Sequence, residues 1–271
     1  MNDTRALHPQ HLRRRFERAA ASFDSADFVH RVTRDGLFSR LQPVVIDADT
    51  VLDLGSATGG AGEPLRRRFR GAHLVSLDVS RSMLSCGRKK RPWYAPLLTR
   101  KHSFVQADAA RLPLADDSID FVFCNLLLPF VDNPDRVFSE VARVLRRDGV
   151  FAFATLGPDS LLEIRRAWGT VDTAAHVNHF QDMHDVGDAL LRAGLRDPVV
   201  DVDPLTVRYP NAEKLFADLT SVGARNALRE RHPALTGRRR FEAMLAALQG
   251  QDDDPVIELR LELVYGHCWG G

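Results

Sequence analysis

Short apolar runs alternate with helical patterns along the first 156 residues of the chain. Two stretches with apolar positions at three- and four-residue spacing come first and predict helices at roughly 10–22 and 27–41. Five apolar runs follow and predict strands over Val51–Leu54, His73–Asp78, Phe104–Asp108, Ile119–Cys124 and Val150–Leu156. Strands that alternate with helices indicate a parallel sheet covered on both faces. The fold class predicted from the pattern is therefore α/β.

The helix between the fourth and fifth strands has clear boundary signals. Asn133-Pro134 supplies a capping residue and a first-turn proline. The sequence therefore predicts a helix whose apolar face is Val137, Val141, Val144 and Leu145 and which ends at Gly149.

The second half of the chain predicts one more helix and two more strands, together with two insertions. Met183–Ala193, followed by Gly194, predicts an amphipathic helix, and two strands are predicted at Val199–Tyr209 and Val256–Tyr265. Helical patterns fill the segment between those strands, at Ala212–Leu219, Ala224–Arg231 and Arg239–Leu248. A long insertion between paired strands is typical of a lid or a substrate-binding element.

These patterns divide the chain into four parts. We expect a helical arm over 1–45, a core over 46–209 with an insertion at 158–181, a helical lid over 210–252, and the last strand with a tail over 253–271. Both insertions should rise above the carboxyl ends of the strands, where open α/β sheets bind ligands.

Composition narrows the classes of protein. The 37 basic and 36 acidic residues leave a net charge of +1, which excludes a globally basic nucleic-acid-binding protein. The three cysteines have no CxxC spacing, which favours a reducing, cytoplasmic location, and the longest apolar stretch is too short to cross a membrane. Asp252-Asp253-Asp254 has no metal-ligand spacing around it, so we expect no metal site.

Carboxylates stand at the ends of three successive predicted strands. These are Asp53, Asp78 and Asp108, and a glycine-rich turn, Gly55–Gly60, follows the first strand. Asp78 is placed to accept hydrogen bonds from both hydroxyls of an adenosyl ribose. Asp108 and the Ala109 amide would face the adenine, and Met83 would cover one face of it. The glycine turn lets the main chain approach the ligand.

The acidic lining selects among adenosyl cofactors. A dinucleotide fits the spacing of the turn, but its pyrophosphate would meet Asp53. S-adenosylmethionine has no phosphate and carries a sulfonium and an ammonium, which suit an acid-lined crevice. The alternative interpretation, a dehydrogenase with a related sheet, is less well supported by these residues.

The motifs resemble those of known methyltransferases. Val51–Gly55, Leu77–Ser80, Ala107–Ala109 and Cys124–Leu126 resemble the successive motifs of class I S-adenosylmethionine-dependent methyltransferases. Ala154–Ser160, His176–Phe180, Asp182–Leu190 and Tyr265–Trp269 resemble the malonyl-acyl carrier protein O-methyltransferases of biotin synthesis. A mitochondrial complex I assembly factor that acts as an arginine hydroxylase is a relative of that family.

The resemblance implies a Rossmann-like seven-stranded methyltransferase sheet with helical lid insertions. It also implies S-adenosyl-L-methionine as donor and the free carboxylate of malonyl-acyl carrier protein as acceptor. Carried over by motif, the cofactor-binding residues are Asp53, Gly55, Gly59, Asp78, Asp108, Ala109 and Asn125. Two alternatives stay open: a cofactor-binding hydroxylase or assembly factor, and a methyltransferase for a small molecule.

The sequence departs from that family at several positions near the expected site. Ala57 replaces a glycine of the turn, Phe23 a common tyrosine and His30 a common glutamine. Leu128-Pro129-Phe130 replaces a polar-aromatic pair, and Arg147–Val150 replaces a Pro-Gly-Gly turn. These departures bear on the identity of the acceptor.

No general base is assigned, because the carboxylate of a malonyl group is already ionised at pH 7. Residues that could orient it are His179 and Arg225, with His176, Asn178 and Tyr209 as weaker candidates. Acyl carrier protein is acidic, so a basic docking face is expected. The runs Arg88–Arg91 and Arg238–Arg240 are preferred over Arg13–Arg15 and Arg66–Arg68.

Overall fold

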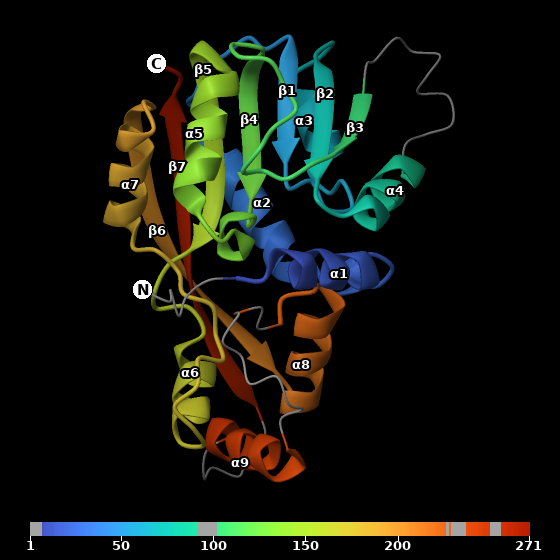
Figure 1. Cartoon of the computed structure of the whole chain (residues 1–271), viewed down its shortest axis with the longest axis vertical. Helices are drawn as coiled ribbons and strands as arrows, with labels where there is room; N and C mark the ends of the chain where they lie inside the picture. Colours follow the sequence, from blue (N-terminus) through green and yellow to red (C-terminus); the bar gives the residue numbers. More distant parts are fainter. Residues whose placement is uncertain (1–6, 91–101, 226–227, 229–236, 250–255) are drawn as a thin grey trace.

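The structure is a computed structural model that describes residues 7–90, 102–225, 228, 237–249 and 256–271. Its strands form a seven-stranded sheet in the order β3-β2-β1-β4-β5-β7-β6 (Figure 1). Their bounds are β1 Thr50–Leu54, β2 His73–Asp78, β3 His102–Gln106, β4 Ile119–Asn125, β5 Leu145–Leu156, β6 Arg196–Tyr209 and β7 Ile257–Trp269. β1 to β5 pair in parallel, and β7 runs antiparallel to β5 and β6. The predicted α/β sheet is confirmed.

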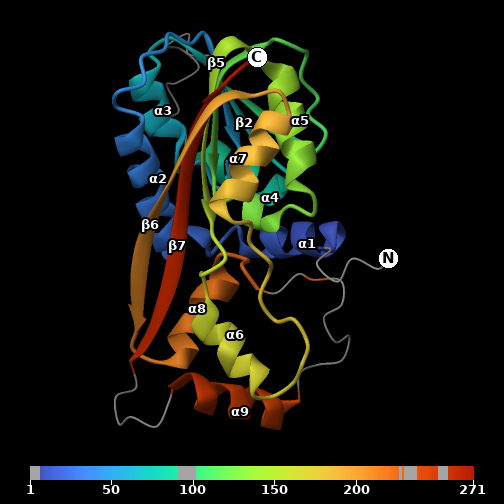
Figure 2. The same ribbon diagram turned by 90° about the vertical axis from the view of Figure 1, so that its left-hand side faces the viewer.

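Helices cover both faces of the sheet (Figure 2). α5 and α7 pack on one face, where Phe138 and Leu190 are fully buried, and α2 and α3 pack on the other with Leu37 and Leu65. The helices and 3-10 turns are α1 Pro9–Ala19, η1 Phe23–Ser25, α2 Phe28–Arg40, α3 Gly62–Arg68, α4 Arg81–Lys89, η3 Leu128–Phe130, α5 Pro134–Val144, α6 Leu162–Gly169, α7 Met183–Arg192, α8 Ala212–Ser221 and α9 Arg238–Gln249.

Polar side chains set where several helices begin. Ser80 accepts from the Met83 N–H before α4, and Asn133 accepts from the Arg136 N–H before α5. Such a cap satisfies one of the amide groups that a helix leaves without an internal partner. The Asn133-Pro134 start read from the sequence is therefore confirmed.

β6 and β7 form a hairpin that extends well beyond the sheet. Their pairing runs from Arg196–Trp269 to Tyr209–Ile257, so β7 is longer at its carboxyl end than the predicted strand, which stopped at Tyr265. The extended part packs against α6, α8 and α9 around Trp168, Leu215 and Met244 (Figure 1). The helical insertions thus pack on the extended ends of β6 and β7, at one side of the sheet.

The predicted ends of β3 and α5 are wrong as well. β3 ends at Gln106, so Asp108 lies two residues beyond the strand. α5 ends at Val144, and Leu145 belongs to β5, because the chain there already pairs with β4. Gly149 lies inside β5, where a Cβ atom would be 2.8 Å from the Asp120 carbonyl oxygen. It permits a close strand contact and does not end the helix.

Several predictions fall partly or wholly outside the described residues. Ala224 and Arg225 are not helical, and most of the helix predicted at 224–231 lies outside. Arg91 and Asp252–Asp254 lie outside as well. In the part that the structure describes, no helix combines the length and apolarity needed to cross a membrane.

Candidate active site

The glycine-rich turn after β1 brings bare main chain to the carboxyl end of the sheet. The Gly55 and Ser56 N–H groups donate to the Leu77 carbonyl, at 2.9 and 3.0 Å, which ties the turn to β2. Gly55 and Gly59 have φ angles of 75° and 79°, and Ala57 has 44° although it carries a Cβ atom. Left-handed backbone is unfavourable for a residue other than glycine. The sequence's departure at Ala57 therefore places local strain in this turn.

Asp78, the last residue of β2, connects the turn to α4. Its Oδ2 accepts from the Ala57 N–H at 2.9 Å, and its Oδ1 accepts from the Ser80 N–H at 2.8 Å. Burial raises the pKa of this carboxyl to about 6, against the opposing effect of those two hydrogen bonds. A carboxylate accepts more than two hydrogen bonds, so Asp78 has capacity left for a ligand.

Asp53 is the most strongly perturbed carboxyl of the site. It is 3% exposed, and its Oδ2 is buried without a hydrogen-bond partner among the described residues. Burial, and then the charge of Asp78, raise its pKa to about 7. An ionised carboxylate in such a place is costly unless an opposite charge accompanies it. The position therefore favours a ligand with a cationic group.

Asp53 and Asp78 line a cavity of about 520 Å³ at the carboxyl ends of β1, β2 and β4, hereafter the cofactor cavity. Met83, Asp108, Ala109 and Asn125 line it too, as does Gly55. The three carboxylates are thus gathered around one space, as the sequence predicts. Gly59 does not line the cavity: a Cβ atom there would be 3.3 Å from the Gly87 Cα, so Gly59 allows the turn to pack on α4.

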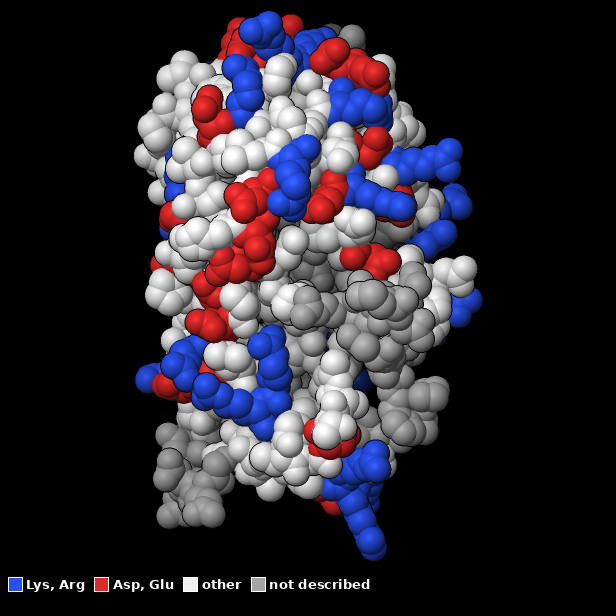
Figure 3. All heavy atoms as spheres, turned by 60° about the vertical axis from the view of Figure 1, so that its left-hand side comes forward, with Lys and Arg blue, Asp and Glu red and all other residues white. Residues whose placement is uncertain are grey.

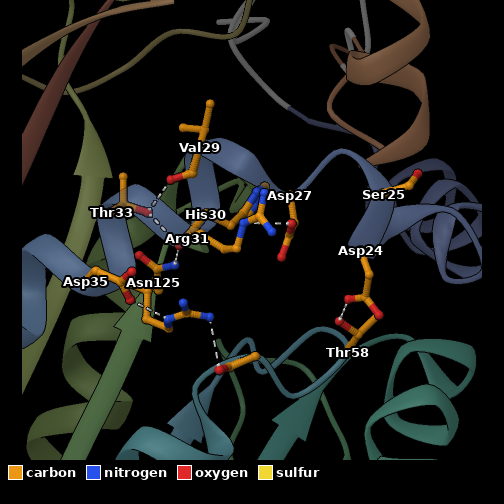
Figure 4. A network of polar contacts seen from close by, with 12 residues as sticks. Asp24, Ser25, Asp27, Val29, His30, Arg31, Thr33, Asp35, Thr58 and Asn125 are labelled. Carbon is orange, nitrogen blue, oxygen red and sulfur yellow. Dashed lines mark hydrogen bonds and ion pairs between the residues drawn. The ribbon is translucent and has the colours of Figure 1, made fainter.

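Residues of the N-terminal arm, such as Leu12, Phe16 and Phe23, line part of the cofactor cavity. Glu17 of α1 accepts from the N–H groups of Arg81 and Ser82 at 2.8 and 2.9 Å, which joins α1 to the start of α4. The Thr58 hydroxyl of the turn donates to Asp24 at 2.5 Å (Figure 4). The predicted arm over 1–45 is therefore part of the site, and not only an appendage to the core.

A second cavity of about 860 Å³ lies between the core and the lid helices, hereafter the acceptor cavity. Its walls are mostly apolar, with Phe180, Phe216 and Phe241 among them. Three arginines from separate parts of the chain also line it: Arg15 of α1, Arg225 after α8, and Arg238 of α9. An apolar space with a few cationic groups suits an acyl chain that bears negative charge.

Three residues line both cavities: His30, Leu126 and Phe130. Leu126 follows β4 and has a φ angle of 56°, another left-handed residue with a side chain. Strained backbone of this kind tends to occur at functional sites. The two cavities therefore meet beside α2 and the end of β4.

The structure separates the two substrate-orienting candidates. Arg225 lines the acceptor cavity, whereas His179 is exposed and lines neither cavity. His176 stacks on Trp168 at 3.8 Å and contacts Asp172 at 2.8 Å, which supports a structural role within the lid. Sequence reasoning quoted Leu126 only as the last residue of a motif. It treated Arg15 and Arg238 only as members of basic runs, because contacts between distant parts of the chain bring these two arginines to the cavity.

The basic runs differ in their surroundings. Arg68 donates to the carbonyls of Leu41 and Val44, as expected for a run on a helix that covers the sheet. Lys90 pairs with Asp24 at 2.7 Å, and Arg88 lies over the Phe104 ring. On the face drawn in Figure 3, positive and negative side chains are interspersed over the core. Lys90 and Arg88 thus contact other residues of the core, whereas Arg15, Arg225 and Arg238 line the acceptor cavity.

Known proteins with similar sequences share one description. The family described as a methyltransferase domain matches residues 52–153. A malonyl-[acyl-carrier protein] O-methyltransferase of Laribacter hongkongensis is 41% identical over 261 residues, which is 95% of this chain and 88% of that protein. One from Methylovorus sp. is 37% identical over 98% of this chain and 90% of its own length. The chain belongs to the malonyl-[acyl-carrier protein] O-methyltransferase family.

Solved structures agree on the fold. The YcgJ protein of Bacillus subtilis has a TM-score of 0.62 at 16% identity, covering 86% of this chain and 97% of its own. A methyltransferase of Thermotoga maritima described as S-adenosylmethionine-dependent has a TM-score of 0.57 at 19% identity and covers 96% of this chain and 100% of its own. Family membership makes this chain an S-adenosylmethionine-dependent methyltransferase with the Rossmann-like fold of class I.

Proposed function

We propose that this chain transfers a methyl group from S-adenosylmethionine to the free carboxylate of the malonyl group carried by acyl carrier protein. The observation that carries the proposal is the meeting of an acid-lined cavity with a larger apolar cavity at His30, Leu126 and Phe130. The names of the curated relatives support the same acceptor. The product would be a methyl ester, which removes the negative charge from the acyl chain.

The residues around the cofactor cavity fit the proposed donor. The unpartnered Asp53 Oδ2 suits the ammonium group, and Asp78 suits the ribose hydroxyls. Asp108 and the Ala109 amide would contact the adenine, with Met83 as one wall and the main chain at Gly55 beside the methionine part. When bound, S-adenosylmethionine supplies an electrophilic methyl group on a positively charged sulfur.

The protein's contribution is to orient the acceptor and to exclude water. A malonyl carboxylate has a pKa near 4, so the enzyme needs no general base at neutral pH. Apolar side chains where the cavities meet, Leu126 and Phe130, would exclude water from the carboxylate. That loss of water favours a step in which opposite charges cancel, and the fixed geometry reduces its entropic cost.

Arg225, together with Arg15 and Arg238, would bind the anionic carrier side of the acceptor. These arginines line the acceptor cavity and do not line the cofactor cavity. Complementary charge raises association rates and selects partners. A cytoplasmic location fits the free cysteines Cys86, Cys124 and Cys268.

A complementation experiment tests the proposed function in cells. Expression of this chain should restore growth without biotin to a bacterial strain that lacks its malonyl carrier protein methyltransferase. The Asp78→Ala variant, produced at the same level, should restore growth poorly. Absence of growth with abundant, folded wild-type protein would contradict the proposal and favour a cofactor-binding assembly factor.

A further inference from the structure

Methyl transfer requires the acceptor oxygen to reach the donor where the two cavities meet. Among the described residues, His30, Leu126 and Phe130 line both cavities, and His30 is the one of these with a polar side chain. Asn178, a buried polar residue of the acceptor cavity, donates to the Pro129 carbonyl and does not line the cofactor cavity. The meeting point therefore offers the acceptor one polar side chain.

The main chain of His30 is fixed from two sides. Its carbonyl accepts from Asn125 Nδ2 at 2.9 Å and from the Thr33 hydroxyl at 3.2 Å (Figure 4). Asn125 ends β4 and lines the cofactor cavity, so this hydrogen bond sets the position of α2 relative to the sheet. The imidazole packs against the Phe23 ring with the ring centres 4.8 Å apart. These contacts limit how the side chain can turn.

The imidazole carries hydrogen-bonding capacity that the protein does not use. Nδ1 is buried and has no partner among the described residues. A buried polar atom left unpaired costs free energy, and such atoms in native structures call for an explanation. Burial lowers the pKa of His30 to about 4. The ring is therefore neutral at physiological pH, with one nitrogen that donates and one that accepts.

We propose that His30 binds the acceptor, donating an imidazole N–H to its carboxylate where the two cavities meet. The inference rests on the proposed function and deepens it by naming the residue that holds the reacting group. A neutral donor orients a carboxylate but leaves its negative charge available for attack on the methyl group. An arginine at this position would neutralise the nucleophile and would also repel the sulfonium of the donor.

The experiment compares His30→Leu with His30→Gln in steady-state kinetics with malonyl carrier protein. His30→Leu removes the donor and should lower kcat/KM at least tenfold, whereas affinity for S-adenosylhomocysteine, measured by calorimetry, should stay within threefold. His30→Gln keeps an N–H donor and should recover kcat/KM to within threefold of wild type. Phe28→Ala, an exposed position on the same helix that lines neither cavity, serves as the control.

Two outcomes would overturn the inference: His30→Leu with wild-type kcat/KM, or equal losses in the Leu and Gln variants. If His30→Leu fails to fold, the inference can be tested on the wild-type protein by nitrogen NMR of the His30 imidazole. A malonyl thioester should shift the His30 ring signals, whereas its methyl ester should not, and equal shifts would count against the proposal. If wild-type enzyme forms no ester at all, the proposed function fails instead, so the two failures are distinguishable.

Discussion

The cofactor cavity and the acceptor cavity are built in different ways. In the first, the N-terminal arm supplies part of the wall, but the carboxylates Asp53, Asp78 and Asp108 come from or follow strand ends within 56 residues of sequence. The second gathers apolar side chains and arginines from α1, α2, the lid helices and the long hairpin. The charged groups of the cofactor cavity thus lie close together in the sequence, whereas the shape of the acceptor cavity depends on how distant elements pack.

The largest expected effect comes from the residue that organises the cofactor cavity. Asp78→Ala removes the acceptor for the Ala57 and Ser80 N–H groups as well as the proposed ribose contact. Affinity for S-adenosylhomocysteine should fall more than tenfold, which corresponds to about 1.4 kcal/mol. Isothermal calorimetry measures it, with the exposed Asp47→Ala as the control. Unchanged affinity in Asp78→Ala would show that the strand-end carboxylates do not bind the cofactor.

The pH dependence of ligand affinity should show how much the ionised carboxylates of the cofactor cavity contribute to binding. The ammonium group of a bound ligand is held best when Asp53 and Asp78 are ionised, and their pKa values are raised to about 7 and about 6. Affinity for S-adenosylhomocysteine should therefore weaken several-fold between pH 8 and pH 5.5. Asp53→Asn should bind more weakly at pH 8 and show less pH dependence. An equal pH dependence in wild type and Asp53→Asn would contradict the assignment.

Lower pH, which should weaken ligand binding, should instead increase the folding stability of the unliganded protein. Both carboxyl pKa values lie above the value near 4 of an unfolded chain, so the folded state takes up protons between about pH 4 and 7. The free energy of unfolding from these groups should rise as pH falls from about 7 to 5. Urea unfolding at both pH values checks this, and Asp53→Asn should reduce the difference. A difference that does not change in Asp53→Asn would show that Asp53 ionises freely in the folded protein.

A smaller effect is expected in the acceptor cavity. Arg225→Ala should raise KM for malonyl carrier protein about two- to fivefold with little change in kcat, because an exposed charge contributes about 1 kcal/mol or less. KM for a small malonyl thioester should change less. Arg208→Ala, an exposed arginine that pairs with Glu258 and lines neither cavity, is the matched control. Equal increases in KM for both acceptors would place Arg225 at the carboxylate itself.

Two substitutions in the turn should change the stability of the protein with opposite signs. Ala57→Gly relieves a φ angle of 44° but makes the unfolded chain more flexible, so we expect stabilisation of about 1 kcal/mol or less. Gly59→Ala should destabilise by about 1–3 kcal/mol, because its φ angle is 79° and the new Cβ atom would approach Gly87. Denaturant unfolding measures the change in the free energy of unfolding for each of the two variants. Two changes of the same sign would contradict this description of the turn.

The sequence predicted the cofactor cavity better than the acceptor cavity. The parallel α/β core and the clustering of the three carboxylates follow from alternating patterns and short motifs, and the structure shows both. The end of α5 was misplaced because Leu145 continues the helical spacing, while its pairing with β4 is a contact that spacing does not reveal. His179 lies in a motif of the family but is exposed, and Arg15 reaches the acceptor cavity from the other end of the chain. Such positions depend on tertiary packing.

The account's central claim is that the two cavities bring a methyl donor and a malonyl carboxylate together. Mass spectrometry of malonyl carrier protein, incubated with this enzyme and S-adenosylmethionine carrying a deuterated methyl group, tests it most directly. We predict the addition of one labelled methyl group per malonyl chain, as an ester that mild base removes. Tight binding of the cofactor together with an unmodified malonyl carrier protein would contradict the claim.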